Sequence, residues 1–164
     1  MNARALAAFM VLVGCVPQAD IPPLSDANGV LDATCTGPYA DMVVDTFPTS
    51  LDGKAALGAP DTQVVTLFVD QVVTVGFIGL GAITDQQGMD LRVHSVGVIA
   101  PGDHAIVQFA GPDMQFRFGG DILADITELD IATATVPAAV YARVTGINGT
   151  VRVDSLEAIH DACR

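Results

Sequence analysis

Most of the chain beyond residue 40 consists of short runs of β-branched and other apolar residues, separated by Gly, Pro and Asp. Runs of about four to eight such residues, bounded by turn residues, are typical of strands, and no segment repeats apolar residues at helical spacing over several turns. The pattern therefore predicts about eight short strands. They are residues 42–47, 64–69, 72–77, 91–99, 105–110, 114–118, 138–144 and 151–159.

Turn residues between these runs indicate how the strands connect. Asp70-Gln71 separates two β-branched runs and predicts a hairpin, and Gly111-Pro112-Asp113 predicts a second one. Residues 122–131 suit either a short helix or a strand. Many short strands with regularly spaced turns predict an all-β domain, an antiparallel β-sandwich of jelly-roll type. A closed barrel is the alternative.

The first 14 residues differ from the rest, with Arg4 followed by an apolar run over residues 5–13. A basic start, a short apolar core and a small residue are the layout of a secretory signal peptide. The run is too short to span a bilayer, which takes roughly 20 residues. Residues 15–34 mix Pro, Asp, Ser and Asn and predict a flexible tether, so the folded domain is expected over residues 35–164.

Leu12-Val13-Gly14-Cys15 resembles the lipobox of bacterial lipoproteins. The resemblance implies cleavage before Cys15, lipid on that cysteine, and export to a bacterial membrane. Val16 after the cysteine is similar to the pattern routed to an outer membrane or the cell surface. An ordinary signal peptide with a chance cysteine is the alternative.

If Cys15 carries lipid, Cys35 and Cys163 remain as a pair in an oxidising compartment. The first precedes the first predicted strand and the second is the penultimate residue. A disulfide between them would join the two ends of the domain. The alternative is a pair of free thiols, one of which would need a nearby activating base.

The chain carries 19 acidic and 7 basic residues, for a formal net charge of −12, and all but two of the acidic residues are Asp. Such a field disfavours nucleic acid, whose phosphates require Lys and Arg, so no nucleic-acid partner is expected. It suits cations, a basic partner, or an acidic surface that is only solvated.

Five phrases occur in an order that resembles a group of bacterial cell-surface and lipoprotein domains with a galactose-binding-like jelly-roll fold. The resemblance spans residues 39–159, with His94 and Ser155 as departures from the family's pattern. It implies the fold more than an activity. The phrases are Tyr39-Ala40-Asp41-Met42-Val43-Val44, Ala56-Leu57-Gly58-Ala59-Pro60-Asp61, Val73-Thr74-Val75-Gly76-Phe77, Asp85-Gln86-Gln87-Gly88-Met89-Asp90-Leu91-Arg92-Val93 and Val153-Asp154-Ser155-Leu156-Glu157-Ala158-Ile159.

Calcium is the candidate cofactor, because it takes six to eight oxygen ligands from carboxylates, carbonyls and water on flexible loops. Asp85 and Asp90 flank a glycine-containing turn, and the resemblance adds Asp61 and Asp154 as further ligands. The alternative is that these aspartates only stabilise turns by accepting hydrogen bonds from nearby backbone groups.

Polysaccharide is the candidate ligand, with Arg92 and Arg143 as the planar polar groups that would contact it. Isolated arginines on strands also serve as solvent-facing salt-bridge partners. The three histidines are scattered, no serine lies in a nucleophile-elbow pattern, and zinc-ligand spacing is absent, so no enzyme is expected.

Together these features predict a lipid-anchored envelope or cell-surface protein. Its β-sandwich is expected to be a binding module, calcium-assisted or not, for a polysaccharide or a surface partner. The alternative is a non-catalytic structural lipoprotein that assembles with other envelope proteins.

Overall fold

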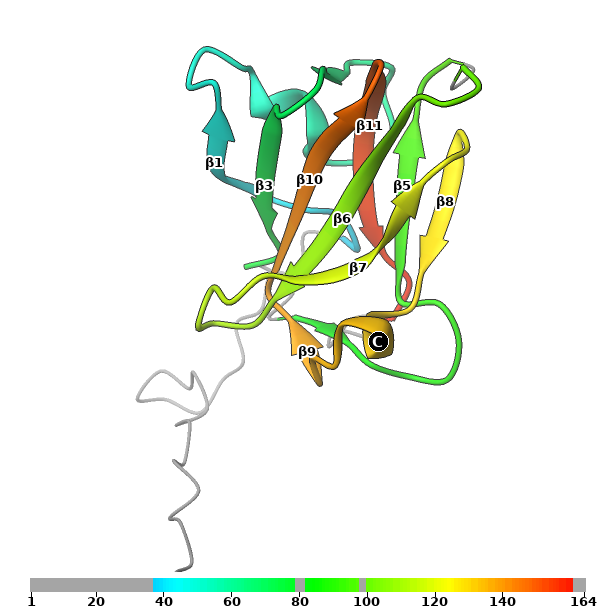
Figure 1. Cartoon of the computed structure of the whole chain (residues 1–164). Coiled ribbons are helices and arrows are strands. Elements are labelled where there is room, and N and C mark those ends of the chain that lie inside the picture. Colours follow the sequence, from blue (N-terminus) through cyan, green and yellow to red (C-terminus); the bar gives the residue numbers. More distant parts are fainter. Residues whose placement is uncertain (1–36, 79–81, 98–99, 161–164) are drawn as a thin grey trace, which may run out of the picture. The chain divides into compact units, whose positions relative to one another are not determined.

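Two antiparallel sheets face each other in the computed structural model, which describes residues 37–78, 82–97 and 100–160 (Figure 1). The described residues belong to one compact unit. Cys15, Cys35 and Cys163 lie outside them, as do the predicted signal peptide and the predicted tether. The five-stranded sheet has the order β1 (Met42–Phe47), β3 (Val72–Gly76), β10 (Tyr141–Asn148), β6 (His104–Ala110) and β7 (Arg117–Ile122).

The four-stranded sheet has the order β2 (Val65–Leu67), β11 (Val151–Ala158), β5 (Leu91–Ser95) and β8 (Ile126–Leu129). A small third sheet pairs β4 (Ile83–Thr84) with β9 (Ala138–Ala139). The chain passes repeatedly from one large sheet to the other, as in jelly-roll sandwiches. The predicted all-β sandwich is therefore confirmed, and the two large sheets do not join into a closed barrel.

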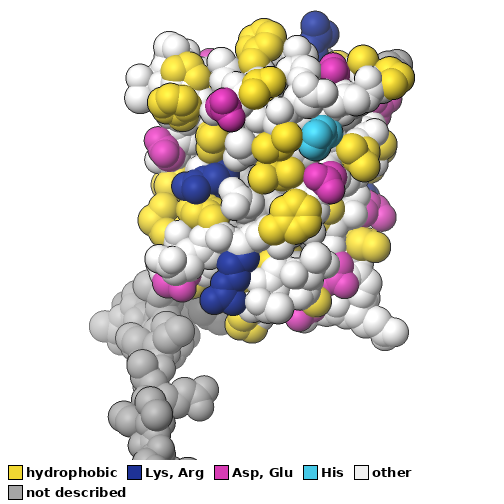
Figure 2. All heavy atoms as spheres, viewed as in Figure 1, with side chains coloured by type: hydrophobic (Ala, Val, Ile, Leu, Met, Phe, Trp, Pro, Cys, Tyr) yellow, Lys and Arg dark blue, Asp and Glu magenta, His cyan; other side chains and the backbone are white. Residues whose placement is uncertain are grey.

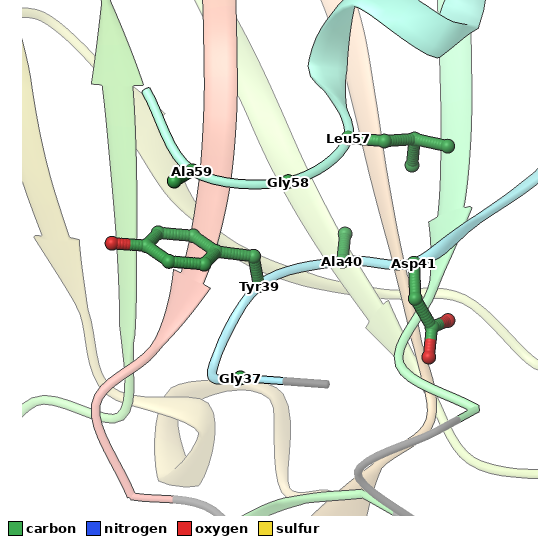
Figure 3. A pocket seen from close by; sticks show the side chains of 7 residues that line it. All are labelled: Gly37, Tyr39, Ala40, Asp41, Leu57, Gly58 and Ala59. Atoms are coloured by element: carbon green, nitrogen blue, oxygen red, sulfur yellow. The ribbon is translucent and has the colours of Figure 1, made fainter. Parts of the chain in front are cut away.

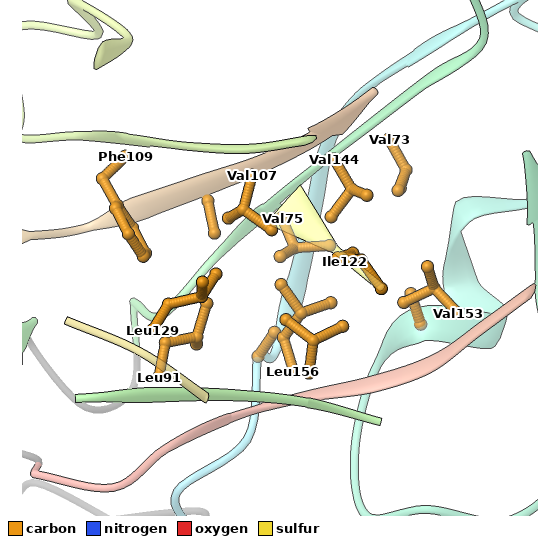
Figure 4. Packing of buried hydrophobic residues seen from close by; sticks show 14 of the residues in the cluster. Val73, Val75, Leu91, Val107, Phe109, Ile122, Leu129, Val144, Val153 and Leu156 are labelled. Carbon is orange, nitrogen blue, oxygen red and sulfur yellow. The ribbon is translucent and has the colours of Figure 1, made fainter. Parts of the chain in front are cut away.

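Side chains from the inner faces of both sheets fill the space between them (Figure 4). Val107 and Phe109 alternate with half-buried residues along β6, and both are fully buried. Leu91 and Leu156 reach the same core from the four-stranded sheet. Because successive residues of a strand point to opposite faces, the same alternation directs a second set of side chains outward.

The predicted hairpin around Gly111-Pro112-Asp113 is confirmed, because β6 pairs with β7. The predicted hairpin around Asp70-Gln71 is wrong. A tight turn is present there, with the Gln71 N–H donating to the Phe68 carbonyl. However, β2 pairs with β11 whereas β3 pairs with β1 and β10, so the turn carries the chain between the sheets.

The ambiguous segment 122–131 ends β7, forms strand β8 and leads into the one-turn 3-10 helix η2 (Ile131–Ala134). Asp130 caps this helix by accepting a hydrogen bond from the Ala132 N–H. A similar short helix, η1 (Gly53–Ala56), follows β1. Within the described ranges, no helix is long and apolar enough to cross a membrane.

Candidate functional site

The two arginines predicted to bind ligand lie on different sheets. Arg92 belongs to β5 of the four-stranded sheet and Arg143 to β10 of the five-stranded sheet. Each alternates with buried neighbours, so each side chain emerges on the outer face of its own sheet. The structure does not bring the two arginines together, and they belong to separate sites.

Arg143 lies in a row of outward-facing residues that crosses the five-stranded sheet. The strand register places Thr74 on one side of it and Gln108 on the other, and Phe118 lies opposite Gln108 on β7. The Arg143 Nε–H donates to Thr74 Oγ1 at 3.2 Å. Its guanidinium carbon lies 3.7 Å from the centroid of the Phe116 ring, a cation–π contact.

No salt bridge involves Arg143 among residues 37–78, 82–97 and 100–160. Its planar group is thus held by a hydroxyl and an aromatic ring rather than neutralised by a carboxylate. A guanidinium carries five N–H groups, and among the described residues only the Nε–H of Arg143 donates a hydrogen bond, so its outer edge retains donors for a ligand.

Aromatic and apolar side chains surround this arginine. Phe118 is 50% exposed, and Figure 2 shows hydrophobic side chains distributed over this face, with basic groups between them. We refer to Thr74, Gln108, Phe116, Phe118 and Arg143 as the Arg143 surface. Of this set, Phe118 is exposed, Gln108, Phe116 and Arg143 are partly buried, and Thr74 is fully buried. Four of these residues escaped the sequence analysis, although the alternation of Phe116, Arg117 and Phe118 indicated that two aromatic rings share one face.

Arg92, in contrast, is enclosed by carboxylates on the four-stranded sheet. Its guanidinium lies 2.7 Å from Glu128 Oε1 and 3.1 Å from Glu157 Oε2, and His94 Nε2 lies 3.0 Å from that same Glu157 oxygen. The hydrogen bond to Glu128 is the main reason that the pKa of Arg92 is raised above its ordinary value. The network joins side chains from the adjacent strands β8, β5 and β11. The Arg92 guanidinium is therefore already occupied by contacts within the domain.

A small open pocket adjoins this network (Figure 3). Tyr39 pairs with Glu157 in an isolated bridge, and its ring borders a volume of about 440 Å³. Most of the lining comes from glycine, alanine and leucine, and Asp41 accepts a hydrogen bond from the Ile78 N–H at 3.0 Å. Because few polar side chains converge there, the pocket does not define a ligand by itself.

The four predicted calcium ligands fall into two separate groups. Asp85 and Asp90 come together, and Asp130, which the sequence analysis missed, joins them with one oxygen from each carboxylate within 4.8 Å of the others. Asp90 is fully buried, and its two oxygens accept the backbone N–H groups of Gln86 and Ile131 at 3.0 and 3.1 Å. This cluster has the donor types that a metal ion requires.

Asp61 and Asp154 form the second group, away from that cluster. The buried Asp154 carboxylate accepts the N–H groups of Asp61 and Thr62 at 3.1 and 3.3 Å. Asp61 in turn accepts hydrogen bonds from the backbone and side chain of Gln63. Here the carboxylates order a loop, as the turn-stabilising alternative describes.

The register of the sheets, not sequence proximity, assembles the sites described above. No protein-family model matches the chain, and no curated protein is significantly similar to it. The chemistry of the described residues is therefore the basis on which a function is assigned.

Proposed function

We propose that this protein is an exported, lipid-anchored binding module that holds a polysaccharide on the outer face of its five-stranded sheet and catalyses no reaction. The observation that carries the proposal is Arg143, stacked on Phe116 and free of any salt bridge among the described residues. The lipobox-like residues 12–15 support export to a bacterial membrane and attachment there through Cys15.

The chemistry of the Arg143 surface suits a sugar chain. Sugar rings present apolar C–H faces, which pack on aromatic rings, and hydroxyl groups, which pair with planar polar side chains. Phe118 supplies an exposed ring, while Gln108 and Arg143 supply amide and guanidinium groups in the same row. Rigid strands fix these groups relative to each other, so little conformational entropy is lost on binding.

A non-catalytic role agrees with the surroundings of the described histidine and serine side chains. Ser155 lies opposite His94 in the register of β11 and β5, and His94 contacts Glu157. Nevertheless, the Ser155 hydroxyl is buried and makes no hydrogen bond in the described part of the chain. A serine nucleophile requires access to substrate as well as a base that accepts its proton, and this buried hydroxyl lacks that access and donates no hydrogen bond to His94.

We also propose that Asp85, Asp90 and Asp130 hold a structural calcium ion. The cluster offers carboxylate oxygens on loops, which calcium prefers, and backbone carbonyls and water would complete the coordination. Three carboxylates this close repel one another, and a cation would remove that repulsion. The ion would fasten the 85–90 loop to the start of η2, because Asp90 already bonds to Ile131.

Affinity electrophoresis in gels that contain bacterial and plant polysaccharides tests the glycan proposal. We expect at least one polysaccharide to retard the protein, and we expect Arg143→Ala and Phe118→Ala each to weaken that binding about tenfold, equivalent to about 1.4 kcal/mol. Arg152→Ala is the matched control, because Arg152 is exposed on β11 of the other sheet.

Two outcomes would contradict the proposal. One is the absence of retardation by any polysaccharide in a broad panel. The other is equal weakening by Arg152→Ala and Arg143→Ala, which would indicate a general charge effect rather than a site on the five-stranded sheet.

A further inference from the structure

Large apolar side chains are exposed together at one end of the sandwich. Phe47 is 63% exposed at the end of β1, and Phe68 and Val69 are 52% and 50% exposed in the turn that leads into β3. Ile147 is 38% exposed near the end of β10. We call these four residues the distal apolar surface.

The register and the turn place these residues at the same end of the sandwich. Phe47 pairs with Val72, and Val72 pairs with Thr145, two residues before Ile147. The turn at residues 68–71 is fastened to the same strand, because the Asp70 N–H donates to the Gly146 carbonyl at 2.8 Å and the Gly146 N–H donates to the Gln71 carbonyl at 2.9 Å. Three strands thus bring the four side chains to one end.

The described chain enters and leaves at the opposite end. There Tyr39 pairs with Glu157, and the Ala158 N–H donates to the Pro38 carbonyl. The first residues of β1 pair at that end with the last residue of β3, where Met42 lies opposite Gly76. The distal apolar surface therefore faces away from the points at which the chain continues beyond residues 37 and 160.

Carboxylates border the distal apolar surface. Asp70 is exposed within the turn itself, and Asp45 precedes Phe47 by two residues on the same outer face. Neither forms a salt bridge in the described part of the chain. Figure 2 shows acidic side chains beside the hydrophobic ones at the upper end of this face, with a basic side chain at its upper edge.

We propose that the distal apolar surface docks a protein whose own contact surface is apolar and bordered by Lys or Arg. Exposed aromatic and aliphatic groups with a charged border are typical of protein interfaces. The exposed carboxylates of Asp45 and Asp70 and the net charge of −12 favour a basic partner. The same charges disfavour a membrane with anionic headgroups and a second copy of this chain. This surface is distinct from the proposed glycan site around Arg143.

The test uses the full-length chain with Cys15→Ser, so that lipid does not interfere, and two amphipathic helical peptides with the same leucine positions. One peptide carries Lys and the other carries Glu on its polar face. Isothermal titration should show binding of the Leu/Lys peptide and none of the Leu/Glu peptide, with the affinity falling as salt is added. Phe47→Ser and Phe68→Ser should each weaken binding about tenfold.

Met89→Ser is the matched control, because Met89 is 46% exposed just before β5, far along the sandwich from β1's end. Equal weakening by this control would overturn the proposal. Retained binding in both Phe variants would also overturn it. So would dimers in sedimentation that Phe68→Ser abolishes, or binding of the unaltered protein to phosphatidylcholine vesicles, since a second copy or a lipid surface would then be the occupant.

Discussion

At the scale of single residues, buried aspartates act on the backbone of neighbouring loops. Asp90 is fully buried and Asp154 is 5% exposed, and each accepts two backbone N–H groups. A buried carboxylate is costly unless its oxygens are hydrogen-bonded, so these contacts explain how the domain tolerates both charges. Part of the strong preference for Asp over Glu in this chain thus serves loop structure.

The effect of calcium on thermal stability, and its dependence on Asp130, tests whether the aspartate cluster binds calcium or only orders its loops. We expect the thermal unfolding midpoint of the protein to rise by several degrees in millimolar calcium compared with excess chelator, because an ion that binds only the native state must stabilise it. Asp130→Asn should abolish that rise. Differential scanning calorimetry of both proteins, with and without calcium, is the measurement.

Asp121→Asn is the control for lost negative charge, because Asp121 is exposed on β7 outside the cluster. It should leave the calcium-dependent rise intact. Superimposed melts of the unaltered protein in calcium and in chelator would instead leave Asp85, Asp90 and Asp130 as loop-ordering residues.

At the scale of elements, the sequence did not predict that the chain passes from one sheet to the other between β2 and β3. The β-branched runs at residues 64–69 and 72–77 have the spacing of a hairpin, and a tight turn does form between them. Gly146 of β10 lies directly against this turn. A Cβ atom at that position would overlap the Phe68 carbonyl oxygen, so glycine lets the turn lie directly against β10.

Gly146→Ala should therefore destabilise the domain. The added methyl group would force the turn at residues 68–71 away from β10 and weaken the two hydrogen bonds that fasten it there. Overpacking of this kind costs about 1–3 kcal/mol. Chemical denaturation of the variant and of the unaltered protein measures the difference in the free energy of unfolding.

Gly111→Ala provides the matched control, because a Cβ atom there would meet only ordinary contacts at 3.7 Å. It should change the free energy of unfolding by less than about 1 kcal/mol. Equal stability of the Gly146→Ala variant and the unaltered protein would show that the turn does not depend on its close approach to β10.

At the scale of the whole molecule, the two outer faces differ in how their charges are balanced. On the four-stranded sheet, Arg92 lies between Glu128 and Glu157 in a closed network. On the five-stranded sheet, Arg143 has a hydroxyl and an aromatic ring as neighbours. The polar groups of the four-stranded face thus pair with each other, whereas Arg143 on the five-stranded face forms no salt bridge among the described residues.

Attachment of the whole protein to a membrane is proposed to depend on Cys15. In a bacterium that processes lipoproteins, the protein should incorporate labelled palmitate and sediment with membranes. Cys15→Ser should lose the label and shift the protein to the soluble fraction, because the acyl chains supply the membrane affinity. Cys35→Ser, the control, should retain the label, and labelling of the Cys15→Ser variant would contradict the anchor.

The sequence by itself determined the strand content, the sandwich architecture and the β6–β7 hairpin. These features follow from local alternation, β-branched runs and turn residues, which act over a few positions of the chain. It also singled out Arg143, Asp85 and Asp90 as candidate binding residues, without indicating their neighbours.

Only the tertiary structure decided which of these residues meet. Strand order and register place Arg143 beside Phe116 and Gln108, bring Asp130 to Asp90, and separate Arg92 from Arg143 on opposite faces. Such contacts join positions far apart along the chain, and their partners depend on which sheet each strand enters. The local sequence pattern does not specify the partner strand, because a β-branched run can pair with more than one neighbour.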